Sequence, residues 1–73
     1  MKVLVLVEDY PSNTSKILMY VHVRNKYYMK KGMEVTVLSF KAKAKYNIDG
    51  INVITLKDYK ANKEKYKDYI LIL

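Results

Sequence analysis

The chain has no cysteine, a single histidine, one proline and two glycines among its 73 residues. The lack of cysteine excludes a disulfide, and one histidine without cysteine leaves no ligand set for a tetrahedral zinc site. A chain of this length buries only about 60% of its unfolded surface, which limits it to one domain with a thin core. Its hydrophobic share of 51% is nevertheless too high for intrinsic disorder.

Long apolar runs are also missing. The first run, Val3–Val7, is ended after five residues by Glu8 and Asp9. A secretory signal needs about 7–15 apolar residues, and a membrane-spanning helix needs about 20. We therefore expect a cytoplasmic protein, with peripheral contact to a membrane as an open alternative.

Short apolar runs that are present predict four strands, over Val3–Val7, Val35–Phe40, Ile51–Leu56 and Tyr69–Leu73. The first and the last run are unbroken, which is typical of strands covered on both faces in a parallel sheet. The third alternates imperfectly, and this favours a half-exposed strand near an edge. Asp49-Gly50, between Tyr46–Ile48 and the third strand, indicates a two-residue hairpin turn.

Two helices are predicted between the strands. Residues Thr14–Lys31 contain no glycine or proline and carry apolar side chains at helical spacing. Gly32 then suits the position that ends a helix, because it adopts positive φ at little cost. A second, shorter helix is predicted over Asp58–Lys67. The fold class is therefore α/β, a partial Rossmann-like (doubly wound) sheet with elements in the order strand, helix, strand, strand, helix, strand and an expected strand order of 3-2-1-4.

The last apolar run has a further implication. A strand that is apolar on both faces belongs inside a sheet, yet Tyr69–Leu73 is the final predicted element. An uncovered apolar edge strand pairs with other chains or aggregates. We therefore expect residues 1–73 to be the N-terminal fragment of a larger Rossmann-like domain, truncated after its fourth strand, and we expect the fragment to self-associate through that strand.

In the order and spacing of four sequence motifs, the chain resembles the N-terminal end of GT-B fold glycosyltransferases of the retaining group 1 (family four) class. The residues that carry the resemblance are Met1–Val7, Tyr10-Pro11, Tyr20–Arg24, Tyr28, Lys31–Leu38 and Tyr46–Val53. Members commonly combine a first strand and Tyr-Pro with a helix containing aromatic-Val-His-x-Arg, then Lys-Gly-x-Glu-Val-x-Val and Tyr-x-x-Asp-Gly-Val-x-Val. The similarity extends over essentially the whole chain.

The resemblance implies a transferase of glycan biosynthesis that moves a sugar from a nucleotide-sugar donor to a glycan or lipid-linked acceptor. The N-terminal domain would hold the acceptor, and the nucleotide-sugar domain and the rest of the acceptor domain are absent from this chain. The fragment itself is expected to be inactive, with no catalytic residue, no metal site and no cofactor. Many members have a Gly-Gly pair after the first strand, where this chain has Pro11-Ser12-Asn13-Thr14.

The candidate substrate-binding residues follow from the position of that loop at the expected cleft. They are Pro11, Ser12, Asn13, Thr14 and Arg24. The hydroxyl and amide groups of the loop suit a sugar hydroxyl or phosphate at a helix N-terminus, and they equally suit helix capping. Arg24 lies on the helix stripe expected to face the sheet, so it either supports the cleft, through Glu8 or an anionic acceptor, or makes a structural ion pair or extends to water.

Other features leave alternatives open. His22 is predicted to be a surface or boundary histidine, since no nucleophile or carboxylate sits at a recognisable spacing from it. Thirteen lysines and eight tyrosines, with a net charge of +7, are typical of nucleic-acid binders, but no nucleic-acid motif accompanies them, so no specific nucleic-acid partner is expected. A small basic α/β binding module, either flavodoxin- or receiver-like or directed at nucleic acid or a membrane surface, is the alternative function. A receiver needs an aspartate at the end of its third strand, and here Asp58 comes two residues late.

Overall fold

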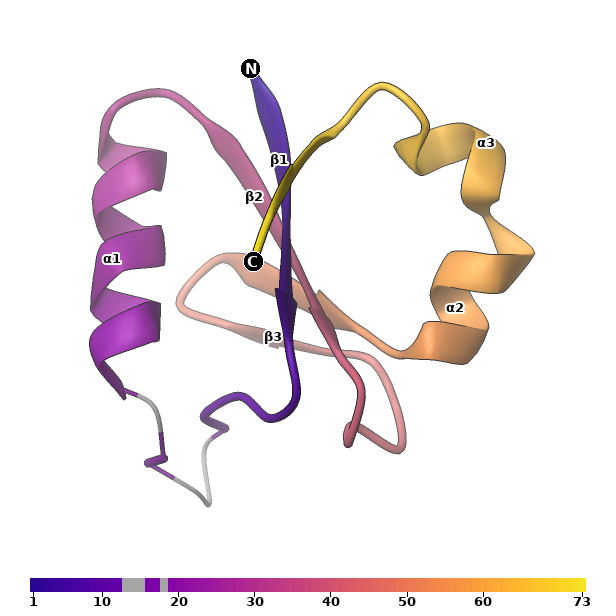
Figure 1. The fold of residues 1–73 in the computed structure, drawn as a ribbon. Helices are drawn as coiled ribbons and strands as arrows, with labels where there is room; N and C mark the ends of the chain where they lie inside the picture. Colours follow the sequence, from indigo (N-terminus) through magenta and orange to yellow (C-terminus); the bar gives the residue numbers. More distant parts are fainter. Residues whose placement is uncertain (13–15, 18) are drawn as a thin grey trace.

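The structure, a computed structural model, describes residues 1–12, 16–17 and 19–73. It is an α/β fold built on one mixed, mostly parallel sheet, which confirms the predicted class. The strands are β1 (Lys2–Val7), β2 (Glu34–Ser39), β3 (Tyr46–Ile48), β4 (Ile51–Ile54) and β5 (Ile70–Ile72). The helices are α1 (Met19–Lys30), α2 (Leu56–Ala61) and α3 (Lys63–Tyr66). Figure 1 shows α1 on one side of the sheet, with α2 and α3 on the other.

The strand order is β3-β4-β2-β1-β5, which differs from the predicted 3-2-1-4 by one additional strand at the edge. The four predicted strands correspond to β4, β2, β1 and β5 and follow one another in the predicted order. The sheet has a fifth strand, because β3 pairs antiparallel with β4 across the Asp49-Gly50 turn and occupies the edge. The Ile51–Leu56 segment lies near an edge, as predicted, since β4 is the neighbour of the edge strand β3. The prediction that it is half-exposed is wrong, because β4 lies between β3 and β2 and three of its four residues are buried. The unbroken apolar strand β1 lies between β2 and β5 and is parallel to both.

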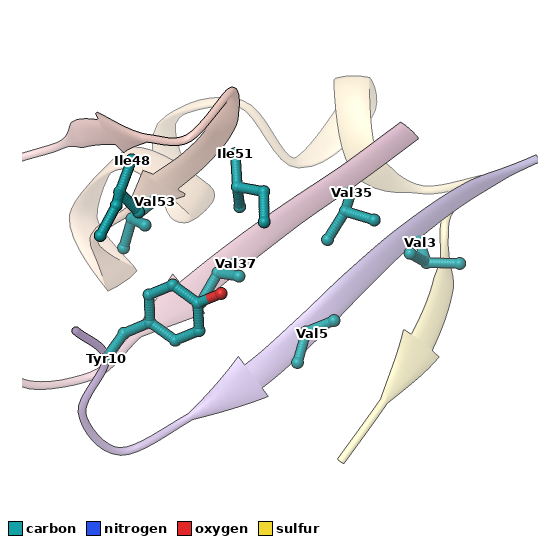
Figure 2. Packing of buried hydrophobic residues seen from close by; sticks show 8 residues of the cluster. All are labelled: Val3, Val5, Tyr10, Val35, Val37, Ile48, Ile51 and Val53. Atoms are coloured by element: carbon teal, nitrogen blue, oxygen red, sulfur yellow. The ribbon is translucent and has the colours of Figure 1, made fainter. Parts of the chain in front are cut away.

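The two faces of the sheet carry separate apolar clusters, since successive side chains of a strand point to opposite faces. Under α1 the buried cluster comprises Val3, Val5, Tyr10, Val35, Val37, Ile48, Ile51 and Val53 (Figure 2). On the face covered by α2 and α3 it is smaller and comprises Leu4, Leu38, Ile54 and Tyr66. Each of the two central strands β1 and β2 contributes to both clusters, which explains why β1 needs apolar residues at successive positions.

The first helix is shorter than predicted. α1 begins at Met19, and of the residues expected to precede it in the helix, Lys16 and Ile17 lie outside it, with Ile17 44% exposed. Gly32, at φ +90°, follows the end of α1 and confirms the predicted role of this glycine.

The second predicted helix, Asp58–Lys67, is two short helices, α2 and α3. The first begins earlier than expected because Thr55 and Asp58 form a reciprocal capping box. The Thr55 hydroxyl accepts a hydrogen bond from the Asp58 N–H, and the Asp58 carboxylate accepts one from the Thr55 N–H.

The last strand pairs with β1 alone, so its other edge has no neighbour in the described part of the chain. Its side chains Ile70 and Leu71 are 51% and 59% exposed, although both are large and apolar. Among the described residues, no helix has the length and apolar character that crossing a membrane requires.

Candidate functional site

The most deeply buried side chains of α1 are polar. His22 and Asn25 are 1% and 0% exposed, while the apolar residues Val21, Tyr28 and Met29 beside them are only partly buried against the sheet. A polar group removed from water costs free energy unless a hydrogen bond replaces the lost one. The partners of His22 and Asn25 therefore decide how α1 is held on the sheet.

These partners come from two other parts of the chain. The Tyr10 hydroxyl lies 2.7 Å from His22 Nδ1 and accepts a hydrogen bond from Asn25 Nδ2 at 3.0 Å. On the other side of the ring, His22 Nε2 lies 2.8 Å from Asp49 Oδ2. We call Tyr10, His22, Asn25 and Asp49 the histidine network. It connects the loop after β1, the middle of α1 and the turn between β3 and β4.

The geometry assigns a proton to each bond of this network. Burial raises the pKa of Tyr10, so its hydroxyl keeps its proton. Because Asn25 already donates to the Tyr10 oxygen, the single hydroxyl hydrogen is free to go to His22 Nδ1. The neutral imidazole then carries its proton on Nε2 and donates it to Asp49. In this arrangement both ring nitrogens of His22 are satisfied.

Asp49 brings the carboxylate to the helix through the geometry of the hairpin turn. Asp49 and Gly50 have φ of +52° and +84°, as a tight two-residue hairpin requires. A Cβ at Gly50 would lie 3.2 Å from the Met29 side chain, so a glycine allows the turn to pack closely on α1. The hydrogen bond from His22 lowers the pKa of Asp49, with a smaller contribution from the charge of Lys26.

The start of the loop after β1 is held by a second tyrosine. Tyr46, from β3, donates its hydroxyl hydrogen to the backbone oxygen of Pro11 at 2.9 Å and lies 3.3 Å from that of Tyr10. The Asp9 carboxylate accepts from the Tyr10 N–H at 2.9 Å. Figure 2 shows the Tyr10 ring lying beside Val37, inside the cluster under α1. The start of the loop is therefore anchored by both its backbone and its side chain.

Two of the predicted loop residues are described, Pro11 as buried and Ser12 as half-buried. Asn13 and Thr14 lie outside the described residues. The remaining candidate, Arg24, is half-buried on α1, and its positive charge is close enough to oppose the rise in the pKa of Tyr10. The structure therefore brings Arg24 near the start of the loop that the sequence indicated.

The surroundings of Arg24 differ from those expected. Its guanidinium carbon lies 5.6 Å from the centre of the Tyr28 ring, and its buried Nε has no hydrogen-bond partner in the part of the chain that the structure describes. Within the described residues it makes no ion pair. The expected partner Glu8 is 79% exposed and lies 3.8 Å from Lys41 instead. The guanidinium of Arg24 therefore has no anionic partner among residues 1–12, 16–17 and 19–73.

Sequence reasoning missed the central residue of the site. His22 is not at the surface or boundary as predicted, and Asp49, which was interpreted only as a turn residue, is its carboxylate partner. One signal was present in the sequence: His22 and Asn25 fall on the same helix face as Val21 and Met29. Two polar residues on an apolar face need partners, but the spacing alone does not identify them.

A groove of about 490 Å³ lies on the opposite face of the sheet, beside α2 and α3. Its polar lining is largely used within the protein, since Asn52 accepts a hydrogen bond from Asn47 and Asp58 caps α2. The described residues include no cluster of three or more histidine, aspartate or glutamate side chains placed to hold a metal ion. The histidine network and the loop after β1 are therefore the stronger candidate site.

Comparison of the chain with models of protein families, with curated proteins and with solved structures finds no match. The resemblance to glycosyltransferases consequently depends on the motifs themselves and on how the structure arranges them.

Replacing Tyr10 by phenylalanine tests the contribution of the network to stability. The change keeps the ring in the core and removes the hydroxyl, which leaves His22 Nδ1 and Asn25 Nδ2 buried without this partner. We expect the free energy of unfolding to fall by about 1–3 kcal/mol, measured by urea denaturation. Tyr20→Phe is the control: Tyr20 is 73% exposed, and its change should stay within about 0.5 kcal/mol. Equal effects of the two variants would contradict this account.

The pKa of Asp49 predicts a dependence on pH. A carboxyl group whose pKa is lower in the folded state stabilises the fold above its unfolded pKa, here 3.8, and this contribution is lost as the pH falls through the folded value. Asp49→Asn should therefore have a lower urea midpoint than the wild type at pH 7, and the two midpoints should converge below pH 3.8. Asp68→Asn, the same chemical change at an exposed position, serves as the control. A constant difference between wild type and Asp49→Asn at all pH values would rule out the proposed role of the charge.

Proposed function

We propose that this chain is the opening segment of the acceptor-side Rossmann-like domain of a GT-B glycosyltransferase. The enzyme would transfer a sugar from a nucleotide-sugar donor to a glycan or lipid-linked acceptor. One observation carries the proposal: the motifs of the resemblance, which are far apart in the sequence, contact one another. Tyr10 and Pro11 of the first motif bond to His22 of the second and to Tyr46 of the last, and His22 bonds to Asp49.

The position of the anchored loop supports the same function. In open α/β sheets, ligands bind outside the carboxyl ends of the parallel strands. The loop that begins at Glu8 leaves the carboxyl end of β1, a central strand of the sheet. The network and the Tyr46 hydroxyl hold Tyr10 and Pro11, which immediately precede Ser12, Asn13 and Thr14 in the sequence. These residues are the proposed contacts to the acceptor.

The surroundings of Arg24 favour an acceptor that carries an anionic group. A guanidinium cannot lose its proton in a protein, so a partly buried one is stabilised by an anion that completes its hydrogen bonds. Its Nε is buried without a partner, and no carboxylate of the described residues pairs with it. The phosphate of a lipid-linked acceptor would supply such an anion.

The exposed apolar side chains of β5 are an argument for a larger parent domain. Ile70 and Leu71 are more than half exposed beside an unpaired strand edge. Such an edge pairs with a further strand. We propose that another segment of the parent enzyme covers β5, and that in its absence copies of this chain associate there. A cytoplasmic location, peripheral to the membrane, belongs to the same proposal.

The receiver-like alternative has less support. β4 ends at Ile54, and Asp58 lies inside α2 with its carboxylate bonded to the Thr55 N–H and hydroxyl. The hydrogen bonds from Thr55 lower the pKa of Asp58. A carboxylate used in this way as a helix cap is not placed as a phosphate acceptor at the end of a strand.

The proposal is tested on the cellular polypeptide that contains this segment. Its size is determined first, and its sugar transfer is then assayed. We expect an antibody against residues 1–73 to detect a protein far larger than 8.6 kDa, because two Rossmann-like domains add roughly 300 residues. Purified, it should transfer labelled sugar from a nucleotide-sugar to a lipid-linked or glycan acceptor. Arg24→Met should lower kcat/KM by about tenfold or more, as expected for the loss of a charged hydrogen bond, at an unchanged Tm.

Lys60→Gln is the matched control for Arg24→Met, since it removes one positive charge from an exposed position on α2. It should leave kcat/KM unchanged. A native polypeptide of 8.6 kDa, or the absence of transfer from every nucleotide-sugar tried, would refute the proposed function.

A further inference from the structure

The face of α1 that points away from the sheet is apolar and basic. Its exposed apolar residues are Met19, Tyr20, Val23 and Tyr27, at 37%, 73%, 61% and 54% exposure. Lys26, Lys30 and Lys31 are exposed around them. We call these seven residues the outer α1 face. Tyr20, Val23 and Tyr27 are spaced by three and four residues, so they form one stripe along the helix.

This arrangement differs from that in an ordinary surface helix, which turns its apolar side to the core and its polar side to water. Here the polar residues His22 and Asn25 face the core, held by the histidine network. The helix cannot rotate to bury Val23 and Tyr27 without breaking those bonds. The outward position of the apolar stripe is therefore a fixed feature of the fold.

The charge of the chain is concentrated around this helix. From Tyr10 to Met33 the sequence has five basic residues and no acidic one, so this third of the chain carries most of the net charge of +7. Lys26 of the outer α1 face lies 3.9 Å from Asp49, whose carboxylate is already bonded to His22. The other lysines of the face make no ion pair within the described residues.

We infer that the outer α1 face docks on an anionic lipid bilayer. A helix that lies in a membrane surface needs apolar side chains to enter the boundary of the acyl chains and lysines to contact the head groups. Tyrosine favours that boundary because its ring is apolar and its hydroxyl is polar. The apolar stripe runs along α1, which is about 18 Å long, so the helix axis would lie parallel to the membrane surface.

The apolar residues favour a bilayer over nucleic acid. Nucleic acid is bound through phosphate contacts and stacked bases, for which Lys30 and Tyr20 suffice, but Met19 and Val23 would gain nothing. Val23 and Tyr27 also form a shallow apolar surface with Lys26 and Lys30. This inference sharpens the peripheral membrane location that belongs to the proposed function. It does not depend on sugar transfer, because it concerns a different face of α1 from the one that contacts the loop.

Vesicle flotation of the purified 73-residue chain tests the inference. The probes are vesicles of phosphatidylcholine alone and of phosphatidylcholine with about 30% phosphatidylserine, at low and at physiological salt. We expect binding to the anionic vesicles only, weakened by salt because the exposed charges are screened. Binding to neither vesicle type at low salt would overturn the inference.

Two pairs of variants locate the contact. Lys30→Gln with Lys31→Gln removes two charges from the outer α1 face, and Lys60→Gln with Lys63→Gln removes two from exposed positions on α2 and α3. The first pair should weaken binding to anionic vesicles by about tenfold or more, since each surface lysine contributes substantially. The second pair, with the same net charge, should weaken it far less. Equal losses would show that only the overall charge matters and would overturn the inference.

Val23→Gln with Tyr27→Gln tests the apolar contribution at unchanged net charge. Both side chains are exposed, so the helical circular dichroism should be retained and should be checked first. Binding to anionic vesicles should fall by about tenfold or more, since burial of two apolar side chains is lost. Unchanged vesicle binding, or equally tight binding of the wild type to a DNA duplex at the same salt, would favour a purely electrostatic surface and contradict docking on lipid.

Discussion

The hydrogen bonds of His22 hold together three parts of the chain that the sequence places far apart. Through Tyr10 they reach the loop after β1, and through Asp49 they reach the hairpin of β3 and β4. α1 has only partly buried apolar residues on its inner side, so these bonds largely determine its orientation on the sheet. Each unpaired group in such a buried network costs free energy, and one atom of this network, Asn25 Oδ1, is buried without a partner among the described residues.

The sequence predicted most of the fold for reasons that are local. Short apolar runs identified four of the five strands, and Asp49-Gly50 and Gly32 identified a hairpin and a helix end through their backbone requirements. The segment that forms β3 was predicted to precede the hairpin turn but was not counted as a strand, because three residues give no measurable alternation. The role of His22 could not be predicted, since it depends on a carboxylate 27 positions away in the chain. Long-range polar contacts leave no periodic signal.

One arrangement of α1 accounts for both proposed surfaces. Because His22 and Asn25 face inward, the loop after β1 is anchored on one side of the helix. For the same reason Tyr20, Val23 and Tyr27 are held outward on the other side. An acceptor that carries a lipid would be presented at the membrane surface, close to the loop that is proposed to contact it. The two surfaces nevertheless rest on different residues and do not require one another.

The protonation pattern of His22 is the most direct measure of the network. At about pH 8, two-bond ¹⁵N–¹H correlation spectra distinguish a protonated ring nitrogen from an unprotonated one. The account predicts a single tautomer, with the proton on Nε2 toward Asp49 and Nδ1 accepting from Tyr10. Averaged nitrogen shifts, typical of an imidazole that exchanges freely between tautomers in water, or a proton held on Nδ1, would contradict it.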